Sequence, residues 1–94
     1  MSLSITVYTK DQCGECVKTR KFLENRGIPH LVQHISDSDE SAIATLKEVA
    51  EGMGVAPSMP YVRVHDEATG DTVAWFGHRP DQIVQHITSK RARK

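Results

Sequence analysis

The chain has 94 residues, enough for one small domain with one hydrophobic core and too few for two domains. Twelve Lys and Arg residues balance twelve Asp and Glu residues, so the net charge favours neither a nucleic acid nor an anionic membrane as the main partner. The first residues lack the basic start and long apolar run of a signal peptide, and no stretch approaches the ~18 apolar residues of a membrane span. We therefore expect a single domain over residues 1–94, with a flexible basic tail at about residues 89–94. We expect the protein in the cytoplasm, where a persistent structural disulfide is disfavoured.

The first half of the chain predicts a β-α-β unit. Residues 3–9 place apolar side chains at every second position among β-favouring ones, which indicates a strand well covered on both faces. Residues 14–26 predict a helix that ends before Gly27 and Pro29, and its less polar positions recur at helical spacing: Cys16, Thr19, Phe22 and Leu23. Residues 28–35 then predict a second strand, which a right-handed crossover places parallel to the first.

The second half predicts a helix, a hairpin and another helix. Asp37, with Glu40 three residues later, is typical of a capping box, and an apolar stripe follows in a helix that ends near Gly52 and Gly54. This stripe consists of Ala42, Ile43, Leu46, Val49, Ala50 and Met53. Residues 61–76 predict an antiparallel hairpin, and Pro80 begins a last helix whose inward-facing positions are Ile83, Val84 and Ile87. The expected order is therefore β-α-β-α-β-β-α, an α/β fold.

Both cysteines lie in one C-x-x-C motif between the first strand and the first helix. Cys13 is expected at or just before the amino end of that helix, where unpaired N–H groups and the helix dipole stabilise a thiolate. Lys10 adds to this positive field and Glu15 opposes it, so we expect the pKa of Cys13 to be lowered moderately. Cys16 lies about one helical turn further on, where its thiol can attack a mixed disulfide on Cys13 and release the reduced substrate.

Two other interpretations of the motif stay open. A structural disulfide in so short a loop gives only about 2 kcal/mol of stabilisation in the chain-entropy treatment, against about 3 kcal/mol for a fifteen-residue loop. A closed structural metal site needs four ligands, and the histidines are scattered along the chain without zinc-ligand spacing near the cysteines. A zinc or iron-sulfur site within one chain is therefore disfavoured, whereas a cluster shared between two chains is not excluded.

Three separate stretches resemble a known family. ITVYTKDQCGEC, SMPYVRV and WFGHRPD are similar to the glutaredoxin-like branch of the thioredoxin superfamily, and in particular to the NrdH-redoxins, small electron donors to bacterial ribonucleotide reductase. With RGIPHLVQHIS, the resemblance extends from Ile5 to about Ile87. It implies a thioredoxin (glutaredoxin-like) fold with a four-stranded mixed sheet flanked by helices. It also implies no bound cofactor, with Cys13 as the attacking thiol and Cys16 as the resolving thiol.

The resemblance implies roles for residues outside the motif. In this superfamily a cis-proline faces the C-x-x-C motif, and Pro60 matches it, with Pro57 as the alternative. The backbone of Met59 would then pair with an extended substrate segment. Residues 75–81 resemble the pattern Trp-x-Gly-x-Arg-Pro-Asp, and the partner-binding candidates there are Trp75, Gly77, Arg79 and Asp81. Trp75 is equally compatible with a place in the core.

The chain departs from ordinary glutaredoxins at three places. Gly14 and Glu15 stand where those proteins carry Pro-Tyr, Ser58 and Met59 replace Thr-Val, and Gly77 stands alone where they have paired glycines. The glutathione pocket is therefore expected to be incomplete. We predict a monomeric dithiol-disulfide oxidoreductase that takes electrons from thioredoxin reductase and passes them to ribonucleotide reductase or another protein disulfide. A glutathione-dependent glutaredoxin and a zinc or iron-sulfur binding module are the alternatives.

Overall fold

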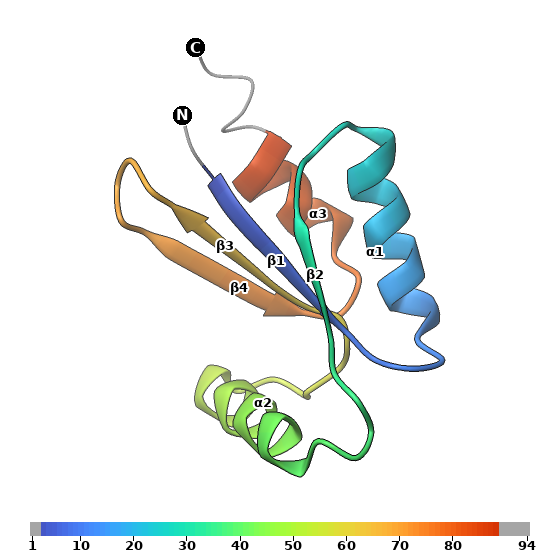
Figure 1. Cartoon of the computed structure of the whole chain (residues 1–94). Coiled ribbons are helices and arrows are strands. Elements are labelled where there is room, and N and C mark those ends of the chain that lie inside the picture. Colours follow the sequence, from blue (N-terminus) through green and yellow to red (C-terminus); the bar gives the residue numbers. More distant parts are fainter. Residues whose placement is uncertain (1–2, 89–94) are drawn as a thin grey trace.

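The computed structural model describes residues 3–88, which form a four-stranded sheet with helices on both faces (Figure 1). The strands lie in the order β2-β1-β3-β4; β2 is parallel to β1, and the other neighbouring pairs are antiparallel. The predicted order of elements and the mixed sheet are confirmed, while the basic tail predicted at residues 89–94 lies outside the described part. The elements are β1 (Leu3–Thr9), α1 (Gly14–Asn25), β2 (Leu31–His34), α2 (Glu40–Met53), β3 (Tyr61–Asp66), β4 (Thr72–Phe76) and α3 (Pro80–Ile83), with a π-helical turn over Val84–Thr88.

The main core lies between the sheet and the pair α1 and α3 (Figure 1). The period-two pattern of β1 directs Ile5 and Val7 to this face, where they meet the buried Leu23 of α1. Each fully buried aliphatic side chain contributes about 1.5–3 kcal/mol relative to an exposed one. The buried cluster is Ile5, Val7, Leu23, Ile28, Val62, Val64, Trp75, Ile83 and Ile87.

The opposite face of the sheet is covered only at one end. At that end α2 lies beside Tyr8 and Tyr61 (Figure 1). Ser4, near the start of β1, is exposed. The prediction that β1 is covered on both faces is therefore wrong for the first half of the strand. The two tyrosine rings are 5.4 Å apart between centroids. Burial is the largest influence on Tyr61 and raises its pKa despite the opposing charge of Arg63.

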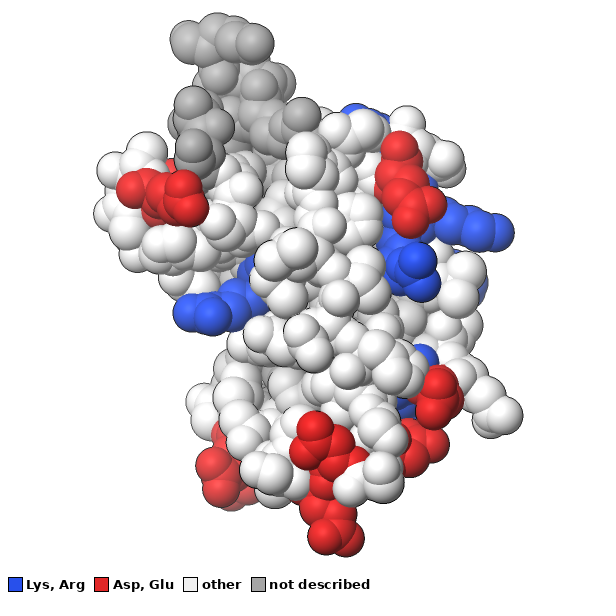
Figure 2. Space-filling view, in the orientation of Figure 1, with Lys and Arg blue, Asp and Glu red and all other residues white. Residues whose placement is uncertain are grey.

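Helix α2 turns its predicted apolar stripe to the sheet but buries it incompletely. Ala50 is buried, Ile43, Leu46 and Val49 are half-buried, and Met53 is 43% exposed. Because the helix contacts only one end of the sheet, hollows remain between the two. The outer side of α2 and its start carry exposed acidic side chains, which colour this end of the molecule red in Figure 2: Asp39, Glu40, Glu48 and Glu51.

The start of α2 corrects one prediction. Asp39, not Asp37, caps the helix: its side chain accepts a hydrogen bond from the Ala42 N–H at 3.1 Å. A turn intervenes after β2, in which the Asp39 N–H donates to the Ser36 carbonyl at 2.9 Å. This turn delays the helix by two residues, which moves the capping position from residue 37 to residue 39. At the other end Gly54 adopts the left-handed conformation, with φ of 71°, that ends many helices.

The last helix begins at Pro80 as predicted, and Ile83 and Ile87 are buried. Val84 is 43% exposed, so its predicted inward orientation is wrong. Val84 points about 100° away from Ile83 around the helix axis, and the side of the helix that faces the core is centred on Ile83 and Ile87. In the part of the chain that the structure covers, no helix has both the length and the apolar character needed to cross a bilayer.

The two ends of the sheet differ in what they carry. The described chain enters at the start of β1 and leaves at the end of the π-helical turn, and both points lie at the same end of the sheet (Figure 1). The loop from β1 to α1 lies at the opposite end, together with the segment that enters β3. The C-x-x-C motif is therefore remote from both described ends.

Candidate redox site

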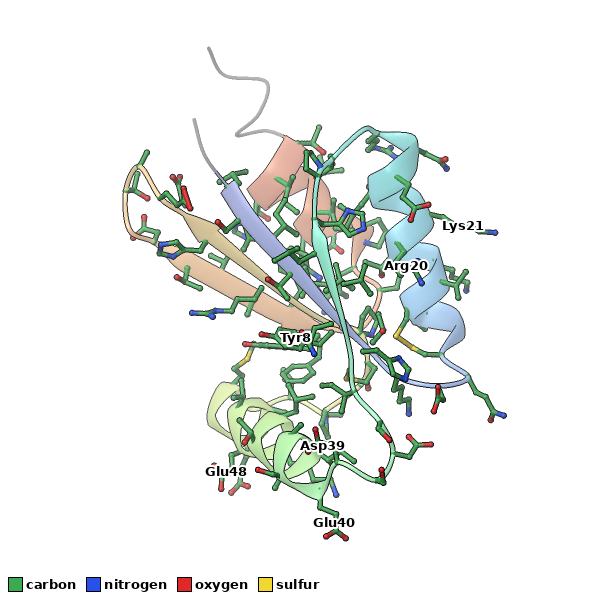
Figure 3. The ribbon with its side chains drawn as sticks, viewed as in Figure 1. Tyr8, Arg20, Lys21, Asp39, Glu40 and Glu48 are labelled. Atoms are coloured by element: carbon green, nitrogen blue, oxygen red, sulfur yellow. A yellow bond between two sulfur atoms is a disulfide. The ribbon has the colours of Figure 1, made fainter. Side chains whose placement is uncertain are left out.

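Cys13 and Cys16 form a disulfide at the amino end of α1, visible as a yellow bond in Figure 3, with their Cα atoms 5.2 Å apart. The loop after β1 turns through Gln12, which has a φ of 53°, and Cys13 occupies the capping position of the helix. The Sγ atom of Cys13 accepts a hydrogen bond from the Cys16 N–H at 3.1 Å. The predicted placement of a sulfur atom at the first turn of the helix is confirmed, and it is where a thiolate gains most from the helix N–H groups.

The two sulfur-bearing residues differ in exposure. Cys13 is half-buried, whereas Cys16 is only 3% exposed. An outside disulfide can reach the first residue more easily than the second. This asymmetry suits a pair in which Cys13 attacks and Cys16 closes the internal disulfide.

A surface hollow of about 460 Å³ surrounds the motif, and we call it the redox hollow. Its lining includes both cysteines together with four residues that can carry charge: Lys10, Asp11, Arg20 and His34. The Nε2 atom of His34, at the end of β2, lies 3.1 Å from the Asp11 Oδ1 atom. This contact joins the loop that precedes Cys13 to the neighbouring strand.

Two residues adjacent to the motif were expected to act on the thiolate in opposite directions. Lys10 lines the redox hollow together with Cys13. Glu15 was expected to oppose the thiolate, but its carboxylate lies 3.1 Å from the Lys18 ammonium group. That exposed pair offsets part of the negative charge beside Cys13.

The cis peptide bond is Met59–Pro60, which decides between the two prolines in favour of Pro60. In the β1·β3 ladder Tyr8 is opposite Tyr61, so Pro60 enters β3 at the end of the sheet where β1 runs into the cysteine loop. Pro60 is buried and Met59 half-buried. The Pro60 carbonyl accepts a hydrogen bond from the Gly77 N–H at 2.8 Å, which fixes the start of β3 to the loop after β4.

Trp75 belongs to the core. It is 5% exposed, and its indole ring stacks on the ring of His86 with centroids 6.1 Å apart. Within residues 3–88 its Nε1 atom has no hydrogen-bond partner. Of the two interpretations of this tryptophan, packing in the core is the one observed.

Beyond Trp75 the segment becomes accessible step by step: Phe76 is buried, Gly77 and His78 are half-buried, and Arg79, Pro80 and Asp81 are exposed. Gly77 has a φ of 90°, a conformation that favours glycine and turns the chain between β4 and α3. The Arg79 Nε atom lies 3.5 Å from the Asp81 Oδ1 atom, so the predicted contact between these exposed side chains is present. Desolvation acts to raise the pKa of Asp81, but its hydrogen bond to Arg79 and the charge of that residue lower it overall.

One contact at the site was missed by the sequence analysis. Thr19 is fully buried, and its Oγ1 atom hydrogen-bonds the Nδ1 atom of His78 at 2.8 Å. The His78 ring also packs edge-on against Phe22, with centroids 6.2 Å apart. The contact joins α1, one turn after Cys16, to the loop that carries Arg79. The helical pattern marks Thr19 as inward-facing, but no local pattern pairs it with a histidine so distant in sequence.

Across residues 3–88, no group of three or more His, Cys, Asp and Glu side chains is placed to hold an ion.

Comparisons with known proteins point to one family. A sequence profile of the family described as Glutaredoxin matches residues 5–68. The glutaredoxin-like protein NrdH of Escherichia coli K12 is 31% identical over 81 residues, which cover 86% of this chain and 85% of that protein. Its counterpart from Salmonella typhimurium is 32% identical with the same coverage.

Solved structures agree with this result. The NrdH-redoxin of Escherichia coli, whose activity profile is described as thioredoxin-like, superposes with a TM-score of 0.59 at 25% identity, covering 88% of this chain and 93% of that chain. A glutaredoxin from Archaeoglobus fulgidus gives a TM-score of 0.61 at 21% identity, covering 89% of this chain and 85% of that chain. The second likeness extends to the fold alone.

Proposed function

Because the chain belongs to the glutaredoxin family and matches its NrdH members over most of its length, we propose that it carries electrons from a thioredoxin-reductase-type flavoenzyme to protein disulfides, with ribonucleotide reductase as the preferred acceptor. The chain is a thiol-disulfide oxidoreductase, which is the activity of this family. The observation that carries the proposal is the Cys13–Cys16 pair at the start of α1, with the first cysteine half-buried and the second buried.

The reaction begins with the reduced protein. The Cys13 thiolate attacks one sulfur of the partner's disulfide, the partner's S–S bond breaks, and its other sulfur leaves as a thiolate that takes up a proton. Cys16 loses its proton and attacks the Cys13 Sγ atom, so the mixed disulfide breaks and the partner's second sulfur also becomes a thiol. Two electrons have then passed to the partner, and this protein holds the Cys13–Cys16 disulfide described above.

Residues around the cysteines would hold the partner during this exchange. Lys10 lines the redox hollow and also a second hollow of about 210 Å³ beside Met59, so the two hollows adjoin at this lysine. An extended segment of the partner could therefore run from Cys13 across Lys10 and pair with the backbone of Met59. Gly77, Arg79 and Asp81 would supply a second, exposed contact surface.

The electron donor is tested by reducing the oxidised protein separately with NADPH and thioredoxin reductase, and with glutathione kept reduced by glutathione reductase. We expect the first system to be much faster, because Ser58, Met59 and the single Gly77 replace the residues with which glutaredoxins hold glutathione. Rapid reduction by glutathione alone would contradict the proposed donor and favour the glutaredoxin alternative. Reduction of the Cys13–Cys16 disulfide back to two thiols is consistent with a protein that acts in a reducing cytoplasm.

The acceptor is tested by trapping. A Cys16→Ser variant leaves the mixed disulfide on Cys13 unresolved, so it should retain oxidised ribonucleotide reductase through a bond that dithiothreitol cleaves. A Cys13→Ser variant is the matched control and should retain none. Elemental analysis of protein purified without chelator covers the remaining alternative, since stoichiometric zinc or iron would support a metal-binding module.

A further inference from the structure

We propose that the redox hollow selects partner disulfides that are flanked by acidic residues, and that Arg20 and Lys10 make this selection. The inference rests on the proposed function, because it concerns the same thiol-disulfide exchange. It adds the chemical class of the partner: an extended protein segment with carboxylates next to its disulfide.

The first step is the balance of charge around Cys13. The redox hollow is lined by two cationic side chains, Lys10 and Arg20, and by one carboxylate, Asp11, which lies 3.1 Å from the His34 imidazole. Glu15, beside the hollow, lies 3.1 Å from the Lys18 ammonium group. Within residues 3–88, neither Lys10 nor Arg20 takes part in a salt bridge. Both are exposed and line the redox hollow. The charge that remains available to a partner in the hollow is therefore positive.

The second step is the distribution of charge over the whole molecule. The chain has no net charge, but acidic side chains gather at the α2 end, whereas both signs occur on the side of α1 (Figure 2). Helix α1 carries three basic side chains, Lys18, Arg20 and Lys21, and two acidic ones, Glu15 and Glu24. In Figure 3, Arg20 and Lys21 lie on α1, whereas Asp39, Glu40 and Glu48 lie at α2. An acidic partner is consequently attracted to the side of the molecule that carries Cys13 and repelled by the α2 end. Such a field acts over about 8 Å at physiological ionic strength, which spans a site of this size.

The third step identifies the occupant as a protein segment. Oxidised glutathione also carries carboxylates, but Lys10 lines both the redox hollow and the separate hollow beside Met59. The second hollow is lined largely by apolar side chains, including Ile35, Ile43 and Leu46. A longer chain can place an acidic residue at Lys10 and an apolar one in this second hollow, and so uses both features.

The test uses three disulfide-cyclised peptides of equal length that differ only in the residues flanking the cysteines: Glu, Gln or Lys. Their rates of reduction by the full-length reduced protein are measured by acid quenching and chromatography. We expect the Glu peptide to react about tenfold faster than the Lys peptide at low salt, with the Gln peptide between them and the difference largely lost at 0.5 M NaCl. Arg20→Glu should reduce this preference to about twofold or less, with Arg20→Gln intermediate. Arg63→Glu makes the same change of charge on the other face of the sheet and should leave the preference unchanged.

The possible results distinguish a failure of this inference from a failure of the proposed function. Equal rates for all three peptides would overturn the inference while the protein still acts as a disulfide reductase. Reduction of none of them would overturn the proposed function and the inference with it. If oxidised glutathione reacts as fast as the Glu peptide, the hollow selects a small anionic disulfide and the assignment of a protein segment is wrong. Circular dichroism of each variant verifies that it is folded.

Discussion

Replacing Thr19 with Val removes the hydroxyl that links α1 to the loop before α3 and keeps the shape of the side chain. The lost contact is the 2.8 Å hydrogen bond between the Thr19 Oγ1 atom and the His78 Nδ1 atom. A buried hydrogen bond of this kind contributes about 0.5–1.5 kcal/mol to stability. His78 is only half-buried, so water can replace part of the lost contact and the upper end of that range is not expected. We expect Thr19→Val to lower the free energy of unfolding by about 1 kcal/mol, which for a domain of this size lowers Tm by about 4–8 °C.

The measurement is urea and thermal unfolding of the oxidised protein. Thr45→Val is the matched control: Thr45 donates to the Ser41 carbonyl at 3.0 Å on an exposed part of α2, and its loss should change stability by less than about 0.5 kcal/mol. His78→Phe keeps a ring against Phe22 but removes the nitrogen atom, so it should cost about as much as Thr19→Val. The double variant should then cost little more than either single one. Full stability of Thr19→Val, or additive losses in the double variant, would refute the proposed link between α1 and this loop.

Three further predictions concern the cap of α2, the core and an aromatic side chain. Asp39→Ala should lower the free energy of unfolding by about 1 kcal/mol, because it removes the cap of α2. Asp37→Ala should change the free energy of unfolding by less than about 0.5 kcal/mol. Urea unfolding measures both variants, and an equal loss of stability in the two would contradict the assigned cap. Leu23→Ala should cost about 2.7–5 kcal/mol because this side chain is fully buried, seen as a lower urea midpoint with an unchanged slope. In a Tyr8→Phe variant, absorbance titration of Tyr61 should give a pKa above the ordinary value of ~10. Because the raised pKa belongs to the folded state, the free energy of unfolding should fall as the pH rises above ~10. A titration midpoint of Tyr61 at or below ~10 would count against the described burial of this side chain.

The elements of this fold are predictable because their signals are local. Alternation in β1, helical spacing in α1 and the proline at the start of α3 each depend on neighbouring residues alone. The errors arise where the answer depends on packing between elements. Both Asp37 and Asp39 can cap a helix, and the turn made with Ser36 decides between them. The incomplete covering of β1 follows from where α2 lies, which no pattern within β1 reveals.

In the candidate site, too, some features follow from local sequence signals and others depend on packing between elements. The place of Cys13 at a helix start follows from a strand, a short loop and a helix in sequence, and the structure agrees. The orientation of Trp75 does not follow, because both faces of β4 accept an aromatic residue and only the position of His86 shows which side is packed. The contact between Thr19 and His78 joins two elements far apart in the chain and needs the three-dimensional arrangement.

The position of the two described ends, at the start of β1 and after the π-helical turn, has a practical consequence for single-molecule and electrode measurements. Both described ends lie at the end of the sheet remote from the disulfide (Figure 1). A tether that continues from either end would attach the protein to a chip or a gold surface with its cysteines directed toward the solution. The same geometry allows a fluorescent protein to be fused at either side as a reporter, without standing between the sulfur atoms and an approaching substrate.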